Sequence, residues 1–152
     1  MAIGEICSRE VVFVQRDEDI KVAAQLMRQH HVGSLVVVDD RNGKRVPAGI
    51  ITDRDIVVAV VALGLNPDAV RAGDVMSQEL VSVREDAGVA ETTGLMRMKG
   101  VRRLPVTDAG GSLVGIVASD DIVSLLAEEM SALATMVSRE HKREAETRKK
   151  IV

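Results

Sequence analysis

Aromatic side chains are nearly absent from this sequence, which has one Phe and no Tyr or Trp in 152 residues. Proteins that bind single-stranded nucleic acid usually stack bases on aromatic rings. The formal net charge is −3, so the chain also lacks the basic excess that a phosphate backbone attracts. Composition therefore argues against nucleic-acid binding, and any planar ligand has to pack between Val, Ile and Met side chains.

Cysteine occurs once, at Cys7, which excludes an intrachain disulfide. Long apolar runs are missing as well, since the longest, Ile56–Leu65, is too short to span a bilayer. The first eight residues lack the basic-then-apolar pattern of a secretory signal. We therefore expect a cytoplasmic protein without a membrane segment, in a compartment that keeps thiols reduced.

Motifs that carry known catalytic chemistry are missing too. The sequence has no Ser-His-Asp order, no Cys-x-x-Cys pair and no Gly-x-x-x-x-Gly-Lys loop. His30 and His31 are adjacent, so on a helix they point to different faces and make a poor metal pair. Cys7 lacks an obvious activating base, which favours a plain buried thiol. We expect neither an enzyme nor a metal site.

What the sequence does contain is an internal repeat. A shift of 69 residues aligns residues 6–39 with residues 75–108 without a gap, and twelve of these 34 positions are identical. The identical pairs include Ser8/Ser77, Glu10/Glu79, Val14/Val83 and Leu35/Leu104. Beyond this stretch the shift falls to 66, and residues 49–57 match residues 115–123. Such regularity indicates two copies of one supersecondary unit.

Each copy has the same order of expected elements, β-α-β-β-α. Short runs rich in β-branched residues predict the strands, and apolar residues at helical spacing predict the first helix. A Gly-containing turn joins the last two strands into a hairpin. The expected strands are 11–14, 35–38 and 48–51 in the first copy, and 80–83, 104–106 and 113–117 in the second. A second helix closes each copy, beginning near Asp53 and Ser119.

One copy alone is too small to cover its own sheet, so we expect the two copies to pack face to face with pseudo-two-fold symmetry. We take residues 1–68 as the first repeat, 69–128 as the second and 129–152 as a C-terminal helical extension. This extension continues one long helix from Ser119 to about Lys150. An apolar stripe at helical spacing is formed by Ile122, Leu126, Met130, Leu133 and Val137. The stripe packs either on its own module or on a second subunit.

The motifs resemble a CBS domain (named for cystathionine β-synthase) present twice. The first copy has Val-Gly-Ser-Leu-Val-Val-Val-Asp at 32–39 and Gly-Ile-Ile-Thr-Asp-Arg-Asp-Ile at 49–56. The second has Val-Arg-Arg-Leu-Pro-Val-Thr-Asp at 101–108 and Gly-Ile-Val-Ala-Ser-Asp-Asp-Ile at 115–122. The resemblance, over about residues 3–128, implies an α/β (α+β sandwich) tandem CBS-domain pair. It also implies binding of an adenine compound (AMP, ADP, ATP, NAD or S-adenosylmethionine) in clefts between the copies.

Carried over residue by residue, the resemblance implies two nucleotide-binding clefts. The first would use Ile50, Thr52, Arg54, Asp55, Met76, Val81 and Val101. The second would use Cys7, Val12, Val32, Gly33, Asp120 and Asp121. Arg102 and Arg103 match family positions that hold phosphates, and we assign this pair to the second cleft.

The chemistry of these residues fits such roles but leaves an alternative open. A carboxylate can accept hydrogen bonds from both ribose hydroxyls, and Arg suits bidentate phosphate contact. Thr52-x-x-Asp55 is also a helix capping box, which needs no ligand. Both roles stay open for Thr52, whereas Asp55 and Asp121 favour a ligand because a cap would tolerate Glu. Ala118 stands where the first copy has Thr52, so we expect Ser119 to take over that cap.

We therefore expect a regulatory module whose two copies are drawn together by an adenine nucleotide. We also expect a homodimer formed through the helices, with Ile56–Leu63 and the second-copy helix as candidate surfaces, and an unidentified regulated protein. The alternative is a ligand-free scaffold for dimerisation or partner docking. Ala118 supports the scaffold, while the Thr52/Asp55 pair and the double Arg argue against it.

Overall fold

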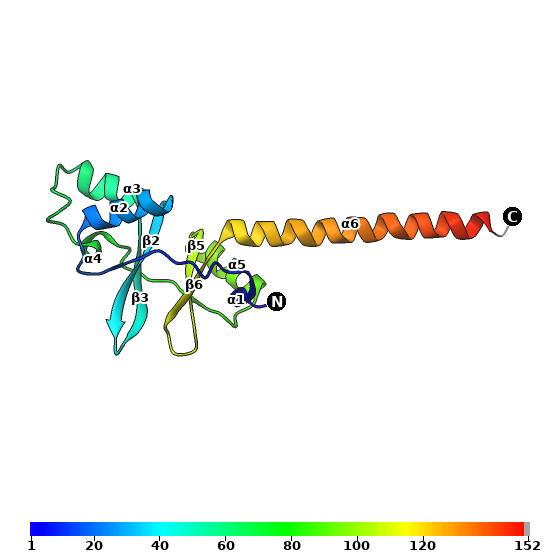
Figure 1. Cartoon of the computed structure of the whole chain (residues 1–152), viewed down its shortest axis with the longest axis horizontal. Coiled ribbons are helices and arrows are strands. Elements are labelled where there is room, and N and C mark those ends of the chain that lie inside the picture. Colours follow the sequence, from blue (N-terminus) through cyan, green and yellow to red (C-terminus); the bar gives the residue numbers. More distant parts are fainter. Residues whose placement is uncertain (151–152) are drawn as a thin grey trace.

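Two similar halves lie side by side in a computed structural model of the chain, which describes residues 1–150, and a long helix projects from the second half (Figure 1). The first half contains α1 (Ile3–Ile6), β1 (Phe13–Gln15), α2 (Ile20–His30), β2 (Ser34–Arg41), β3 (Lys44–Thr52), α3 (Asp53–Ile56) and the π-helix η1 (Val57–Val61). The second half contains α4 (Ala72–Val75), β4 (Val83–Arg84), α5 (Val89–Lys99), β5 (Arg103–Thr107), β6 (Leu113–Ala118) and α6 (Ser119–Lys149).

Each half forms a three-stranded sheet, in the order β1-β2-β3 and β4-β5-β6. In both sheets the first pair of strands is parallel and the second pair is an antiparallel hairpin. The expected fold class, a mixed α/β pair of β-α-β-β-α repeats, is confirmed. The first strands are shorter than expected, because parallel pairing begins only at Phe13 and at Val83.

Strand β2 is covered on both faces, as its unbroken apolar run predicts. Leu35 and Val37 belong to the core that also contains residues of α2 and α3. Val36 and Val38 alternate to the opposite face of the sheet and are fully buried as well. The sheet of the first half is therefore an internal layer, and its second face lies toward the rest of the molecule.

The two halves exchange their first segments. Ile3 of α1 and Cys7 belong to the core of the second half. Ala72 of α4 and Met76 belong to the core of the first half. Both pairs are separated by the repeat shift of 69 residues, so the exchange is symmetric. A boundary near residue 68 thus divides the sequence copies, whereas each core contains residues from both sides of it.

Gly49 makes room for residues 72–79 of the second repeat, which cross into the first half and which we call the crossing segment. A Cβ atom on Gly49 would lie 2.8 Å from Met76 Sδ and 3.0 Å from the Ser77 carbonyl oxygen. At this close approach the Ser77 N–H donates to the Ile50 carbonyl oxygen (2.9 Å), and the Ile50 N–H donates to Ser77 Oγ (3.0 Å). The crossing segment is therefore held by hydrogen bonds to the edge of β3.

Gly115 has the same role in the second half. A Cβ atom there would lie 2.7 Å from Cys7 Sγ and 2.9 Å from the Ser8 carbonyl oxygen. The Ser8 and Ile116 backbones exchange two hydrogen bonds, each of 2.9 Å. The pseudo-symmetry of the fold therefore extends to the contacts that join the two halves.

Replacing Gly49 or Gly115 by Ala should destabilise the protein by roughly 1–3 kcal/mol, because the new methyl group overlaps a packed sulfur and a backbone oxygen. Urea unfolding of the variants measures the change. Gly94→Ala is the matched control, since its Cβ would meet nothing within 4 Å and Ala favours the helix by about 0.5–1 kcal/mol. Equal stability of all three variants would contradict a tight crossing.

Candidate functional site

A cavity of about 280 Å³ opens where the two halves meet. Its size is close to the lower end of small-molecule sites, which span roughly 300–1,000 Å³. The first half supplies the end of β3, α3 and the start of β2, and the second half supplies the segment before β4 and the start of β5. The lining residues are Ser34, Ile50, Thr52, Asp55, Ser77, Glu79, Leu80, Val81, Val101, Arg102, Arg103 and Leu104.

Aliphatic side chains form most of the cavity wall, among them Ile50, Val81 and Val101. The one aromatic ring of the chain lies outside this set, because Phe13 packs under the Arg45 guanidinium at 4.5 Å from the ring centroid. The cavity wall is therefore mainly aliphatic, and how it would enclose a planar ligand stays a prediction.

Thr52 and Asp55 form a complete capping box at the start of α3. The Asp55 N–H donates to Thr52 Oγ1 (3.1 Å), and the Thr52 N–H donates to Asp55 Oδ2 (2.9 Å). Asp55 therefore has a structural role as well as a place in the cavity wall. Its other oxygen, Oδ1, makes no hydrogen bond to another residue within 1–150, and this atom is the one available to a ligand.

The second repeat keeps half of this cap. The Ala118 N–H donates to Asp121 Oδ2 (2.7 Å), but Ala118 has no hydroxyl to complete the box. Ser119 does not replace it, contrary to our expectation, because Ser119 is already the first residue of α6 and its hydroxyl donates to Asp120 Oδ1 (3.2 Å). Both carboxylates thus serve as helix caps, so a carboxylate at these positions does not by itself indicate a ligand.

The double Arg lies in the first cleft, and its assignment to the second cleft was wrong. Arg102 and Arg103 follow Val101 directly, so the bend before β5 places all three residues at the same opening, across from Thr52. The Arg102 guanidinium also lies 3.5 Å from Asp120 Oδ1, an exposed pair of little energetic weight. The side chain of Asp120 therefore lies beside Arg102 of the first cleft.

Two residues predicted for the first cleft do not line the cavity. Arg54 is exposed on the outer side of the short helix α3. Met76 is 8% exposed, because it fills the core of the first half against Gly49. The crossing geometry that buries Met76 is a feature of the tertiary structure, which the repeat alone does not reveal.

The residues predicted for the second cleft are dispersed. Val12 and Val32 line a second hollow with Phe13, and Cys7, Gly33, Asp120 and Asp121 are not among its lining residues. A Cβ atom on Gly33 would lie 3.2 Å from Asp53 Oδ2, so this glycine accommodates the adjoining helix start. Among residues 1–150, the first cleft brings five of its seven predicted residues together in one cavity, and the second cleft does not do so.

Cys7 is a core residue. Burial raises the pKa of the Cys7 thiol above its ordinary value, and the nearby positive charge of Arg9 opposes this shift only in part. The thiol therefore stays protonated near neutral pH, and a protonated thiol is a poor nucleophile. This environment fits the plain buried thiol that the sequence favours.

Sequence reasoning missed the polar residues on the crossing segment, Ser77 and Glu79. Glu79 accepts a hydrogen bond from Lys99 (2.6 Å), which lowers the pKa of the Glu79 carboxyl. A signal was present, because Ser8/Ser77 and Glu10/Glu79 are identical across the repeat although they precede a strand that needs only apolar residues.

Residues 1–150 contain neither a metal-binding cluster nor a membrane-spanning helix. Within them, no three His, Cys, Asp or Glu side chains gather closely enough to hold a metal ion. The helices of the same region include none that combines the length and the apolar character needed to cross a membrane.

The sequence pattern of the CBS domain matches residues 3–62 and 72–128, so this chain belongs to the CBS domain family as a tandem pair. It is 45% identical over 125 residues to an uncharacterized protein of Methanopyrus kandleri, covering 82% of this chain and 62% of that protein. It is 36% identical over 124 residues to Hypoxic response protein 1 of Mycobacterium tuberculosis, covering 82% and 84%. The chain thus spans less than two thirds of the first relative.

Solved structures give the same result for the fold. Hypoxic Response Protein I with two coordinated zinc ions is 34% identical, with a TM-score of 0.72 over 82% of this chain and 98% of that one. A CBS domain pair in complex with 5′-methylthioadenosine and S-adenosyl-L-methionine is 28% identical (TM-score 0.70; 83% and 99% covered). A hexameric CBS-CP12 protein from bloom-forming cyanobacteria is 30% identical (TM-score 0.69; 81% and 69% covered). Proteins of this fold therefore include nucleoside binders and oligomers.

The unequal caps of the two repeats predict opposite effects of matched substitutions. Ala118 has φ −107° and ψ 158°, close to the −113° and 161° of Thr52, so a Thr at 118 can cap Asp121 in the same way. Ala118→Thr should raise the free energy of unfolding by about 1 kcal/mol, and Thr52→Ala should lower it by about as much. Urea unfolding at neutral pH tests this, and a neutral result for both would show that the caps contribute nothing.

Proposed function

We propose that this chain is a regulatory module that binds an adenine nucleotide in the cavity between its repeats. One observation carries the proposal: an available carboxylate oxygen of the first repeat and two guanidinium groups of the second repeat line the same aliphatic cavity. A nucleotide needs this combination, since its base is apolar and planar, its ribose donates hydrogen bonds and its phosphates are anionic.

Each group of the cavity has a role in the proposal. Val81 and Val101 would enclose the adenine from both sides together with Ile50. Asp55 Oδ1 would accept hydrogen bonds from the ribose. Arg103 would bind phosphate, because its exposed guanidinium has no partner among residues 1–150 and is suited to bidentate contact. The complex of a related CBS pair with two adenosine compounds supports this class of ligand.

The proposed effect of ligand binding depends on the fact that the ligand-binding groups belong to both repeats. Asp55 and Arg103 belong to different repeats, so a ligand that contacts both would favour one arrangement of the two halves. We propose that a homodimer presents this change to a regulated protein. Val57, Val58 and Val61 of η1 support the dimer, because more than half of each side chain is exposed. A cytoplasmic location and the absence of catalysis are parts of the same proposal.

A second candidate function is a ligand-free scaffold for dimerisation or partner docking. The observation that favours it is that Asp55 and Asp121 both act as helix caps, so neither needs a ligand to account for it. The scaffold and the sensor differ in one property, which is whether any adenine compound stabilises the protein.

Thermal unfolding and calorimetry with AMP, ADP, ATP, NAD and S-adenosylmethionine test the proposal. A compound present at a hundred times its dissociation constant should stabilise the fold by about 2.7 kcal/mol. Arg103→Gln should weaken the binding of a phosphorylated ligand by roughly 10- to 100-fold, because a hydrogen bond to a charged group is lost. Adenosine, which has no phosphate, should bind both proteins about equally.

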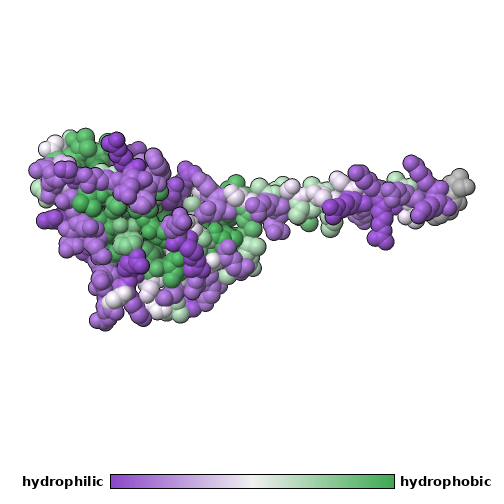
Figure 2. All heavy atoms as spheres, viewed as in Figure 1, coloured by the Kyte–Doolittle hydropathy of each residue, from purple (hydrophilic) through white to green (hydrophobic). Residues whose placement is uncertain are grey.

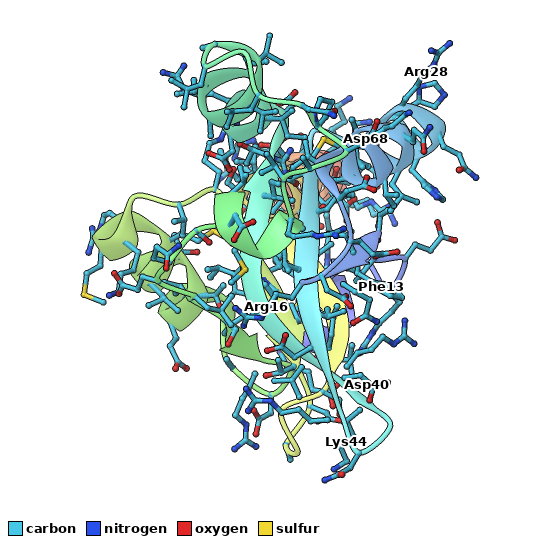
Figure 3. All side chains as sticks on the ribbon, turned by 90° about the vertical axis from the view of Figure 1, so that its left-hand side faces the viewer. Phe13, Arg16, Arg28, Asp40, Lys44 and Asp68 are labelled. Carbon is cyan, nitrogen blue, oxygen red and sulfur yellow. The ribbon has the colours of Figure 1, made fainter. Side chains whose placement is uncertain are left out.

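The matched control is Arg28→Gln, because Arg28 is exposed at the end of α2 and points into solvent (Figure 3). Asp55→Asn is the second informative variant, since the amide oxygen can keep the cap while the charge is removed, and Asp121→Asn makes the same change in the other repeat. Equal affinities of the Arg103→Gln and Arg28→Gln variants for the phosphorylated ligand would show that Arg103 does not bind phosphate. If none of the five compounds binds, the scaffold is the better description.

A further inference from the structure

Most of α6 projects beyond the body of the protein and carries an apolar stripe that is largely exposed, with only Leu126 at its base lining a hollow beside α5 (Figures 1 and 2). Ile122 packs into the core of the second half and is 5% exposed. The stripe itself, which we call the α6 seam, is 43% to 71% exposed and consists of Val123, Leu126, Met130, Leu133 and Val137. Apolar side chains in such a continuous row on a solvated helix mark an interaction surface.

The spacing of the α6 seam identifies the shape of its partner. Successive seam residues are three, four, three and four positions apart. This is the a/d pattern of a heptad repeat, by which two helices pack side by side with interlocking side chains. A sheet or a loop would not require that spacing. The partner that fits the seam is therefore another helix with the same spacing.

The distribution of charge along α6 indicates that this partner helix is α6 of a second copy of the chain. Residues 119–137 contain four acidic and no basic residues, whereas residues 138–149 contain five Lys or Arg and three Glu. The helix is thus acidic toward its N-terminus and basic toward its C-terminus. An antiparallel second copy would place each basic end beside an acidic end, and the two helix dipoles would also oppose each other favourably.

A parallel arrangement is disfavoured by the residues that follow the seam. Glu140 and Glu144 continue its spacing, so a parallel pair would bring each of them against its own copy in the partner. The next flanking positions would set Arg143 beside Arg148 of the second copy. Like charges at these distances repel, and antiparallel pairing avoids all three contacts.

We propose that α6 pairs with α6 of a second copy of this chain in an antiparallel arrangement. Two antiparallel registers pair four seam residues of each copy, and one of them also sets Lys142 and Arg143 beside Asp121 and Asp120 of the second copy. In this register Met130 lies against Leu133 of the second copy and Leu126 against Val137 of the second copy, while Val123 lies opposite Glu140. Ala127 then meets Ala134 of the second copy beside the seam, and these small residues permit close approach of the helices. The inference rests on the homodimer of the proposed function and gives it a surface, but it does not depend on nucleotide binding.

Disulfide crosslinking tests the arrangement directly. In the proposed register, a mixture of Leu126→Cys and Val137→Cys proteins should form a crosslinked dimer under mild oxidation. Either variant alone should not, since two copies of residue 126 lie 11 positions apart along the pair, or about 16 Å. The wild type, whose only thiol is the buried Cys7, gives the background level on a non-reducing gel.

The matched control is a mixture of Glu128→Cys and Thr135→Cys proteins, which occupy the same axial register on the opposite face of α6 and should stay at background. Strong crosslinking of Leu126→Cys alone would show a parallel pair and overturn the proposal, as would equal crosslinking of the control mixture. Sedimentation of the wild type shows whether the protein is a monomer or a dimer when no seam crosslink forms. A dimer without the seam crosslink would leave the homodimer in place and remove α6 as its surface, and nucleotide titrations of the same proteins report separately on the cavity.

Discussion

The close approach of two backbones at Gly49, and again at Gly115, is the constraint on which the rest of this structure depends. At each point a segment from one repeat crosses the hairpin of the other, and a side chain larger than hydrogen would require the two backbones to shift apart. The register of each hairpin also shifts beside its glycine, between Val37 and Val38 and between Val106 and Thr107. The crossing thus links the two cores and bends the strand that leads to the following helix.

The cavity is a product of this crossing. Ser77 is hydrogen-bonded to Ile50, and the chain that continues from Ser77 forms one wall while Thr52 and Asp55 form another. A ligand there would contact a segment that holds the two cores together. For this reason a small molecule in the cavity could alter the relation between the repeats without a hinge or a mobile loop.

Much of the fold could be predicted from the sequence, because repeat identity and apolar spacing are properties of consecutive residues. The shift of 69 residues and the hairpin turns lead to the correct sheets, and the aliphatic lining at Ile50, Val81 and Val101 follows from the family resemblance. The residues whose positions were predicted wrongly share one reason. Met76 is buried and Arg102 and Arg103 face the first cleft because of how the segments cross in space, which sequence separation does not encode. The capping role of Asp55 could be predicted from the sequence. That its Oδ1 atom makes no hydrogen bond to another residue within 1–150 could not be predicted.

The exchange of first segments also has a consequence for the order in which the protein is made. The first core stays incomplete until Ala72 and Met76 have been synthesised, although η1, the last element of its own repeat, ends at Val61, eleven residues before Ala72. Ile3 and Cys7 wait longer, because the core that they belong to also contains Ile122. Each core is thus completed only by residues of the other repeat, so we expect the two repeats to fold together rather than one after the other.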